Sequence, residues 1–453
     1  MGNLLVSLHN ATSAMKVYER AMGVVQGNVA NASTPGYAKQ QQLLESTRFD
    51  LDHGLPGGVR SGGTLDSRST FAENAVRRRL ESLASSDERT SQLEQIEPVL
   101  DISDTSGLGG ALNRLFQAFS AVTVAPNDAS SRQVVLDRAA ELARAFNAAA
   151  AGLTGASDNV GRSINQQVDH INSTAEKIVA VNRLFRADYK AQFDAGLQAR
   201  MSTLLDDLSD AANFTVLRAE DGSATLFLGG QTLVGIGETQ YRITADTSSQ
   251  PARVLDPQGQ DISSQITGGR LESLLNLRNQ VIPQYSEQVD RLGQSFADTV
   301  NDTLAGGLDR NGQPPARNLF RYDASLGVAR TLNVDNLAPS ELALASVDAP
   351  GGNAVALQLA GLSQSKSLDG FTFMQFYGNV AAQAGRDLNA ARENLAGNQQ
   401  LVSQAKSLRD DLQTVNLDEE AALLLQYQRG YQALARVVQT LNDMTDTLVN
   451  LLR

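Results

Sequence analysis

Apolar residues recur with a helical spacing at both ends of the chain and less regularly between them. Near the N-terminus the series is Leu4, Leu8, Ala11, Met15, Tyr18, Met22, Val25 and Val29. Near the C-terminus, with one polar member, it is Leu424, Tyr427, Tyr431, Leu434, Val438, Leu441, Thr445 and Leu448. Steps of three and four residues place the members of each series on one side of a helix, in the a/d repeat of a coiled-coil seam. The pattern therefore predicts a coiled-coil helix at each terminus.

Two terminal seams on one chain indicate that the ends meet and assemble with other copies. A heptad repeat can also close within one chain as an antiparallel pair, so this alternative stays open. Each terminal helix is marginal alone in water, because an isolated helix depends on the packing of its apolar face. We therefore expect both ends to be loose in the free monomer and to become fixed on assembly.

A turn is expected directly after the N-terminal helix. The helix is predicted over residues 3–31, and Thr34, Pro35 and Gly36 end it. Pro35 presets φ and removes a hydrogen-bond donor, and Gly36 supplies a positive φ at the next turn position. The residues that follow, 38–67, are predicted to be extended.

The middle of the chain changes between helical and β-type patterns. Helices are predicted over 68–100, 108–122, 128–150, 157–212, 268–304, 367–414 and 417–452. Short β-type runs, separated by Asp-Gly and Gly-Gly turn signals, cover 214–217, 225–228, 232–236 and 241–244. Residues 319–362 are expected to be irregular.

These elements predict a mainly α fold with an inserted small β domain, in an elongated, nested multi-domain architecture. The two terminal helices form a coiled-coil assembly domain of residues 1–40 and 415–453. A helical core domain comprises residues 41–213 and 268–414. The small β domain spans residues 214–267.

Composition and charge argue against several classes of function. The 453 residues carry a formal net charge of −12, whereas a nucleic-acid-binding protein would show a basic patch. The one dense basic cluster, residues 77–79, lies in a predicted helix near Glu73 and Glu81, which predicts a solvated, ion-paired helix face. The absence of cysteine removes disulfides and thiolate chemistry, and is compatible with an exported bacterial protein. Neither a cleavable signal peptide nor a membrane span is expected.

No group of residues predicts a catalytic, metal or cofactor site. The only histidines are far apart in sequence: His9, His53 and His170. Two S-x-x-K matches, at Ser363 and Ser403, lack the K-T-G motif that accompanies them in penicillin-binding enzymes. The stretch 309–312 lacks the ligand spacing and the final Glu of a calcium loop. We therefore predict that the protein is not an enzyme.

Two short segments resemble the terminal motifs of bacterial flagellar axial proteins, which are the rod, hook and hook-associated proteins. Asn28–Tyr37, NVANASTPGY, resembles their N-terminal motif, and Val415–Glu420, VNLDEE, resembles their C-terminal motif. The motifs are specific as a pair, because they lie at opposite ends of the chain and each adjoins a seam. The resemblance implies an assembly interface with these candidate residues: Leu4, Leu8, Met15, Tyr18, Met22, Val25, Val29, Asn31, Pro35, Gly36, Tyr37, Leu424, Tyr427, Tyr431, Leu434, Val438, Leu441 and Leu448.

The middle of the chain resembles one branch of this family, the hook-associated protein 1 branch. Rod and hook proteins have β structures between their terminal helices, whereas long helices are predicted here over 68–212 and 268–414. The segment 268–320 is also similar to this branch. Larger members carry a further β domain late in the chain, and the irregular residues 319–362 stand in its place here.

The resemblance implies a structural role outside the cell, in the first of two junction layers between hook and filament. The implied partners are other copies of this chain, the hook protein, the second hook-associated junction protein and an export chaperone in the cytoplasm. Neither nucleic acid nor membrane is expected as a partner, and no cofactor is expected. The alternatives are a hook or distal rod protein, or a secreted cell-wall hydrolase with axial-type termini, which would need an acid/base carboxylate pair in a cleft.

Overall fold

The computed structural model describes residues 2–50, 55–101, 106–236 and 238–451. The chain forms two compact units. The first comprises Met1–Ser82, Ile171–Arg242 and Gln399–Arg453, and the second comprises Leu83–His170 and Ile243–Asn398. Three of the four limits between these units fall within helices, α2 (Thr70–Ile96), α4 (Ala129–Ala187) and α10 (Phe373–Gln413), and the fourth lies at Arg242/Ile243. The described fold is mostly helical with small sheets, as predicted.

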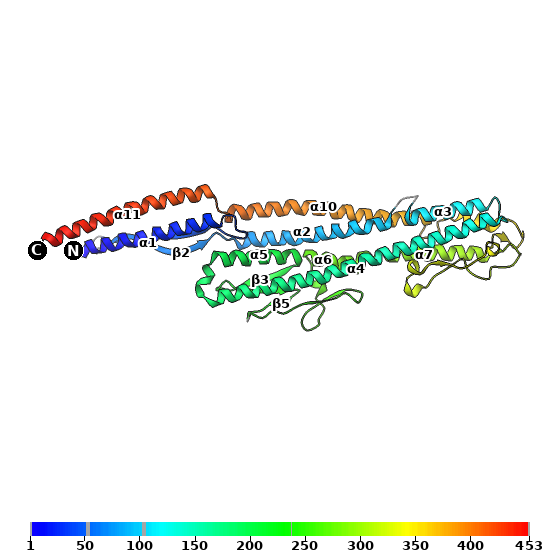
Figure 1. Cartoon of the computed structure of the whole chain (residues 1–453), viewed down its shortest axis with the longest axis horizontal. Coiled ribbons are helices and arrows are strands. Elements are labelled where there is room, and N and C mark those ends of the chain that lie inside the picture. The colour runs from blue at the N-terminus through cyan, green and yellow to red at the C-terminus, as the bar shows by residue number, and fades with distance from the viewer. Residues whose placement is uncertain (1, 51–54, 102–105, 237, 452–453) are drawn as a thin grey trace. The chain divides into compact units, whose positions relative to one another are not determined.

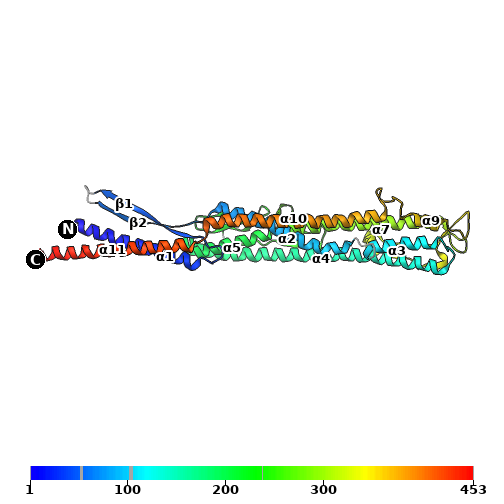
Figure 2. The same ribbon diagram turned by 90° about the horizontal axis from the view of Figure 1, so that it is seen from above.

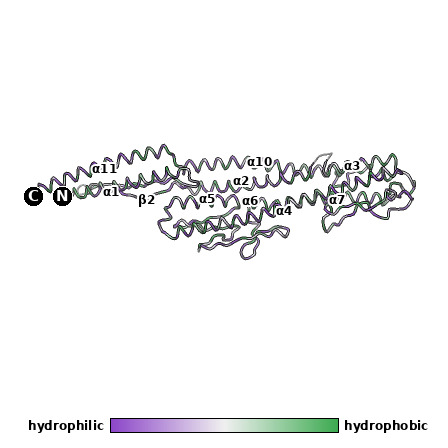
Figure 3. Tube along the Cα trace, in the orientation of Figure 1, coloured by the Kyte–Doolittle hydropathy of each residue, from purple (hydrophilic) through white to green (hydrophobic). Residues whose placement is uncertain are grey.

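In the first unit the N-terminal helix α1 (Gly2–Asn31) lies along the C-terminal helix α11 (Leu417–Leu451). Both chain ends lie at the same end of this pair, so the helices are antiparallel (Figures 1 and 2). The antiparallel closure within one chain is thus the arrangement observed. Hydrophobic and hydrophilic stretches alternate along both helices, as expected for stripes on a helix surface (Figure 3).

A long β-hairpin also packs against α1, in addition to α11. Its strands are β1 (Gln40–Asp50) and β2 (Leu55–Asp66), which pair antiparallel with a register shift at Leu43/Leu44. The expected extended conformation of residues 38–67 therefore takes the form of a hairpin. Helix α1 is the element that both α11 and the hairpin contact.

The first unit also holds α5 (Ala195–Ala211) and a three-stranded sheet. Its strands, β3 (Phe214–Arg218), β4 (Ala224–Leu228) and β5 (Gln231–Val234), pair in that order. The next strands, β6 (Thr244–Asp246) and β7 (Arg253–Leu255), form a separate two-stranded sheet and belong to the second unit. The residues expected to form one small β domain are therefore divided between two separate sheets in the described chain, because no ladder joins β5 to β6.

The second unit is built mainly from helices. These are α3 (Gly107–Val122), α6 (Gly269–Asn276), α7 (Ile282–Ala305), α8 (Val328–Thr331) and α9 (Ala354–Gly361), with parts of α2, α4 and α10. A π-helical turn, Leu277–Val281, joins α6 to α7. The region expected to be irregular contains only short elements: β9 (Phe320–Arg321), α8, β10 (Asn333–Val334), β11 (Ala345–Ser346), α9 and the 3₁₀ turns Ala324–Leu326 and Pro339–Glu341.

Phenylalanine rings fill the centre of the second unit. The ring of Phe296 makes edge-to-face contacts with Phe116, Phe320 and Phe373, at centroid distances of 5.9, 5.8 and 5.2 Å. Such contacts add about 0.5–1.5 kcal/mol each beyond burial. This cluster brings α3 and α7 together with the start of α10 and strand β9.

Helix α4 corrects one expected boundary. Two helices, 128–150 and 157–212, were predicted, but α4 runs without interruption to Ala187, and a break follows before α5 begins at Ala195. Gly152 lies inside this helix, and a Cβ there would lie 2.7 Å from a methyl group of Val99. The glycine therefore serves close packing inside a helix rather than ending it.

Candidate assembly site

The predicted seam of α1 is buried unevenly. Ala11 and Val25 are buried, whereas Leu4, Leu8, Met15, Tyr18 and Met22 are half-buried. The other buried apolar side chains of α1 are those of Ala14, Val17 and Ala21. A single partner helix would bury one narrow stripe, but α1 packs against both α11 and the hairpin, so its buried face is wider than the seam.

Val29 is the clearest correction within this seam. It was expected to face the partner helix, but its side chain is 46% exposed. The adjacent Asn28 is completely buried instead. In the last turn of α1, the buried side chain is therefore the amide of Asn28 and not the apolar side chain of Val29.

The seam of α11 faces inward on one side only. Leu424, Tyr427, Tyr431, Leu434, Val438 and Leu441 are half-buried, and Leu448 is just exposed. After Glu420, no described side chain of α11 is buried. Large apolar side chains also lie exposed on this helix: Leu425, Val437, Met444 and Val449. Helix α11 thus has one covered face and a long uncovered surface.

Tyr18 and Tyr427 pack against each other between the two helices. Their ring centroids are 5.9 Å apart with an interplanar angle of 56°. Burial, the charge of Glu420 and the neighbouring Tyr18 raise the pKa of Tyr427 above its usual value. The Tyr427 ring therefore stays neutral at physiological pH.

Asn28 joins the two terminal motifs through its side chain. Its Nδ2 donates to Glu420 Oε2 at 3.0 Å and to the carbonyl oxygen of Gln40 at 2.8 Å. Its Oδ1 accepts from the hydroxyl of Tyr37 and from the backbone N–H of Gln40, both at 2.9 Å. Every hydrogen-bonding position of this buried amide is used.

Lys39 balances the charge of the buried Glu420 carboxylate. Its Nζ lies 3.0 Å from Glu419 Oε2 and 3.3 Å from Glu420 Oε1. Burial lowers the pKa of Lys39, but the two carboxylates raise it further, and the net pKa lies above its usual value. The backbone N–H of Lys39 also donates to the carbonyl oxygen of Gln413, at 2.8 Å. Lys39 therefore ties the end of the N-terminal motif to both ends of the loop before α11.

Asn31 acts locally, whereas the carbonyl oxygen of Pro35 accepts from the Thr203 hydroxyl of α5 at 3.4 Å. The side-chain amide of Asn31 donates to the carbonyl oxygen of Gly27, and its oxygen accepts from the Thr34 hydroxyl. Pro35 is exposed. These residues shape the end of α1 and do not reach α11.

Gly36 has the positive φ predicted for it, +74°. Arg68 Nη2 donates to its carbonyl oxygen at 2.8 Å. A Cβ at Gly36 would lie 2.6 Å from the carbonyl oxygen of Ala199 in α5. Both conformation and close approach therefore require glycine at this turn.

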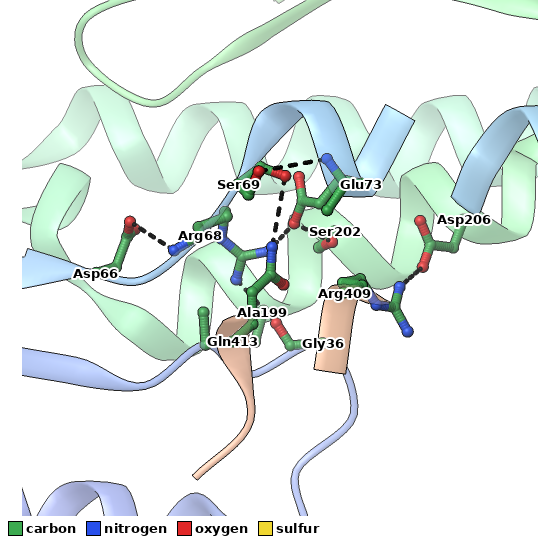
Figure 4. Close-up of polar contacts among 12 residues, drawn as sticks. Gly36, Asp66, Arg68, Ser69, Glu73, Ala199, Ser202, Asp206, Arg409 and Gln413 are labelled. Atoms are coloured by element: carbon green, nitrogen blue, oxygen red, sulfur yellow. Dashed lines mark hydrogen bonds and ion pairs between the residues drawn. The ribbon is translucent and has the colours of Figure 1, made fainter. Parts of the chain in front are cut away.

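A buried ion cluster stands beside this turn (Figure 4). Glu73 is paired with Arg68 and, at 3.2 Å, with Arg77, and its Oε1 accepts from Ser202 at 3.0 Å. Burial raises the pKa of Glu73, but the charges of Arg68 and Arg77 lower it further, so that it lies below the usual value. The carboxylate is therefore ionised and stabilises the cluster.

Asp206 of α5 extends the cluster to the end of α10. It accepts from Arg77 Nε at 3.1 Å and from Arg409 Nη1 at 2.9 Å. A small cavity of about 140 Å³ lies next to it, lined by residues that include Gly36, Tyr37 and Arg409. The cluster thus holds together three chain segments: the turn after α1 at Gly36, the end of the hairpin at Arg68 and the end of α10 at Arg409.

The sequence interpretation of Arg77 was half right. Its pairing with Glu73, four residues earlier, is present, but the side chain is only 5% exposed and not part of a solvated face. Its second partner, Asp206, lies 129 residues away in sequence. Arg68 and Asp206 carried no sequence signal of a shared site, whereas Glu73 lay near the predicted basic cluster, and Asn28 and Glu420 lay within the two terminal motifs.

The described residues contain no group of three His, Cys, Asp or Glu side chains placed to hold a metal ion. Within the same residues, no helix has both the length and the apolar character needed to cross a membrane. His53 lies outside the described residues.

Two family models match parts of the chain. Residues 93–320 match the family model of the flagellar hook-associated protein FlgK helical domain. Residues 413–451 match the model of the flagellar basal body rod FlgEFG protein C-terminal region.

Full-length relatives and a solved structure are also similar. Flagellar hook-associated protein 1 of Bacillus subtilis (strain 168) is 23% identical, with 99% of each chain covered. The protein of the same name from Escherichia coli (strain K12) is 21% identical, with 98% of this chain and 99% of the relative covered. The structure of the flagellar hook junction protein FlgK from Burkholderia pseudomallei shares the fold, with a TM-score of 0.67 at 15% identity, over 74% of this chain and 99% of that one. Because the helical-domain model covers half of the sequence, the chain belongs to the FlgK family of flagellar hook-associated proteins.

Proposed function

We propose that this protein is a structural subunit of the bacterial flagellum that forms the junction between hook and filament. Copies of the chain assemble into a layer through their terminal parts, residues 1–40 and 415–453. The relatives named flagellar hook-associated protein 1 match over nearly their whole length, which supports this role. No catalytic step is part of the proposal.

The observation that carries the proposal is the contact between Asn28 and Glu420. It joins the two terminal motifs, 392 residues apart in sequence, at the base of the α1–α11 pair. From there α11 extends with only one side covered and with large apolar side chains on its free surface, among them Val437 and Met444. Exposed apolar surfaces of this kind mark sites of protein association.

Within this proposal the seam residues have two roles. The half-buried ones, such as Tyr18, Tyr427 and Leu434, hold α1 and α11 together. The exposed ones, Val29 and Leu448, are available to neighbouring copies.

The hook protein lies on one side of the layer and the second hook-associated junction protein on the other. The chain is exported to the extracellular flagellum after binding a cytoplasmic chaperone.

Electron microscopy of a strain that lacks this chain tests the role. We expect complete hooks without filaments, flagellin shed into the medium, and restoration of filaments when the chain is supplied from a plasmid. Filaments on the hooks of the deletion strain would contradict the proposal. Cells without hooks would instead identify the chain as a hook or distal rod component.

A further inference from the structure

The apolar seam alone does not determine how far α11 is shifted along α1. Tyr427, Leu434 and Leu441 recur at steps of seven residues on the face of α11 that is half-buried. A shift by seven residues moves a helix by about 10.5 Å at ~1.5 Å per residue. Such a shift brings another large apolar seam side chain to most positions, the exceptions being Thr445 and Glu420, so the apolar contacts of two registers are similar.

The buried polar contact between Asn28 and Glu420 distinguishes these registers. Both side chains are completely buried, and Asn28 uses all of its hydrogen-bonding positions. In a shifted register Glu420 would leave Asn28 Nδ2 and Lys39 Nζ. A buried carboxylate and a buried amide donor would then lack partners, which is strongly unfavourable.

Gly430 distinguishes the registers a second time, through shape. A Cβ on Gly430 would lie 3.0 Å from the ring of Tyr18. The ring therefore lies against the backbone of α11 at a place where this helix has no side chain. A shift by seven residues would bring Leu423 or Val437 to this place, and either would overlap the ring.

We infer that Asn28, Glu420 and Gly430 set the register of the α1–α11 pair, while the apolar seam supplies its attraction. The inference rests on the proposed function, in which this pair is the element that assembles. A buried polar group that selects one alignment is a well-attested device in coiled coils. A single register gives every copy the same outer surface, which a regular layer of subunits requires.

Photo-crosslinking in assembled flagella tests this inference. Met22, a half-buried seam position, is replaced by the photoreactive amino acid p-benzoylphenylalanine, and its adducts on α11 are mapped by mass spectrometry. Adducts within one chain are separated from those between chains by gel mobility. In the otherwise unchanged protein we expect one cluster of intrachain adducts.

The double variant Glu420→Leu with Gly430→Leu removes the buried polar contact with Asn28 and the gap that accommodates the Tyr18 ring, and it adds apolar surface. We expect a second cluster of adducts, displaced by seven residues, at a yield comparable to the first. Glu420→Gln keeps an acceptor for Asn28 and should retain a single cluster. Gln432→Leu adds an apolar side chain to the exposed face of the same helix and should also retain one cluster.

A single native cluster in the double variant would overturn the inference. So would a complete loss of defined adducts, because the two residues would then stabilise docking without selecting a register. Absence of intrachain adducts in the unchanged, assembled protein would contradict the α1–α11 pair itself, and hence the proposed mode of assembly.

Discussion

Gly36 and Ala199 approach so closely that a Cβ on the glycine would lie 2.6 Å from the carbonyl oxygen of Ala199. Replacement of Gly36 by valine would add this contact to the cost of a positive φ, which is about 1–2 kcal/mol for a residue with a Cβ. The turn would move away from α5, and Arg68 would lose its bond to the Gly36 carbonyl oxygen. We expect Gly36→Val to leave the melting transition of the helical part unchanged and to abolish assembly.

Gly63 provides a matched control for this variant. Its φ is also positive, +103°, but no atom lies within 4 Å of a Cβ built on it. Gly63→Val should therefore show the conformational cost without the collision, and should assemble better than Gly36→Val. Electron microscopy of complemented cells and calorimetry of the purified proteins measure the two effects. Normal filaments with Gly36→Val would refute the expected role of the turn.

The seam of α11 is tested by replacing Leu434 and Leu441 together with Asp. Both side chains are half-buried on the covered face of the helix, so two carboxylates there would oppose docking. Cells should form hooks without filaments, while the main melting transition of the protein stays near that of the wild type. Gln432→Asp with Gln439→Asp introduces the same charges, with the same spacing, at exposed positions and should leave the docking of α11 on α1 intact. A main transition lowered by many degrees in the leucine variant alone would show that these leucines belong to an ordinary folding core.

Glu73 should make the protein sensitive to acid. Its pKa is lowered in the folded state by Arg68 and Arg77, despite the opposing effect of burial. The stabilisation is therefore complete above the ordinary Glu pKa of about 4.3 and is lost as the pH falls through the lower, folded value. Glu73→Gln should be less stable than the wild type at pH 7 and should lose less stability between pH 5 and pH 3. Denaturant unfolding across this range measures the difference, and equal slopes for the two proteins would contradict it.

Glu81 should have the opposite pH dependence. Burial raises its pKa to about 7, and the charge of Arg78 offsets this only in part. Because the folded state holds the proton more tightly than the unfolded state, stability falls as the pH rises from about 4.3 to about 7. Glu81→Gln should therefore raise the melting temperature more at pH 8 than at pH 5. The same increase at both pH values would argue against a raised pKa.

Limited proteolysis tests whether the terminal pair is loose before assembly. Trypsin sites at Lys16, Arg20, Arg429 and Arg436 are all exposed, and α11 has no buried described residue after Glu420. In dilute full-length protein we expect rapid loss of roughly the first 40 and the last 40 residues, leaving a stable fragment. In assembled flagella the same sites should be protected. Protection of both ends in the dilute monomer would contradict this expectation.

Local chemistry explains which parts of the structure could be predicted from the sequence. The Pro35–Gly36 turn and its positive φ depend on adjacent residues, and the structure confirms the positive φ. The terminal helices follow from their heptad patterns, but the same pattern serves intrachain and interchain pairing equally well. The antiparallel pairing of α1 with α11 within one chain could therefore be established only from the structure. The buried state of Arg77 was missed because Asp206 comes from a distant helix, and the continuity of α4 through Gly152 involves close packing against Val99, which is distant in sequence.

The contact between Asn28 and Glu420 also fixes an order of events in time. The two residues are 392 positions apart in sequence, so at ~5–20 residues per second the ribosome delivers the second about 20–80 s after the first. Throughout that interval the first helix of the chain exists without its last partner. The packing of α1, a helix that is made early, is thus among the last parts of the fold to be completed. Until α11 has been made, the apolar stripe of α1 that packs against it has no helical partner within the chain.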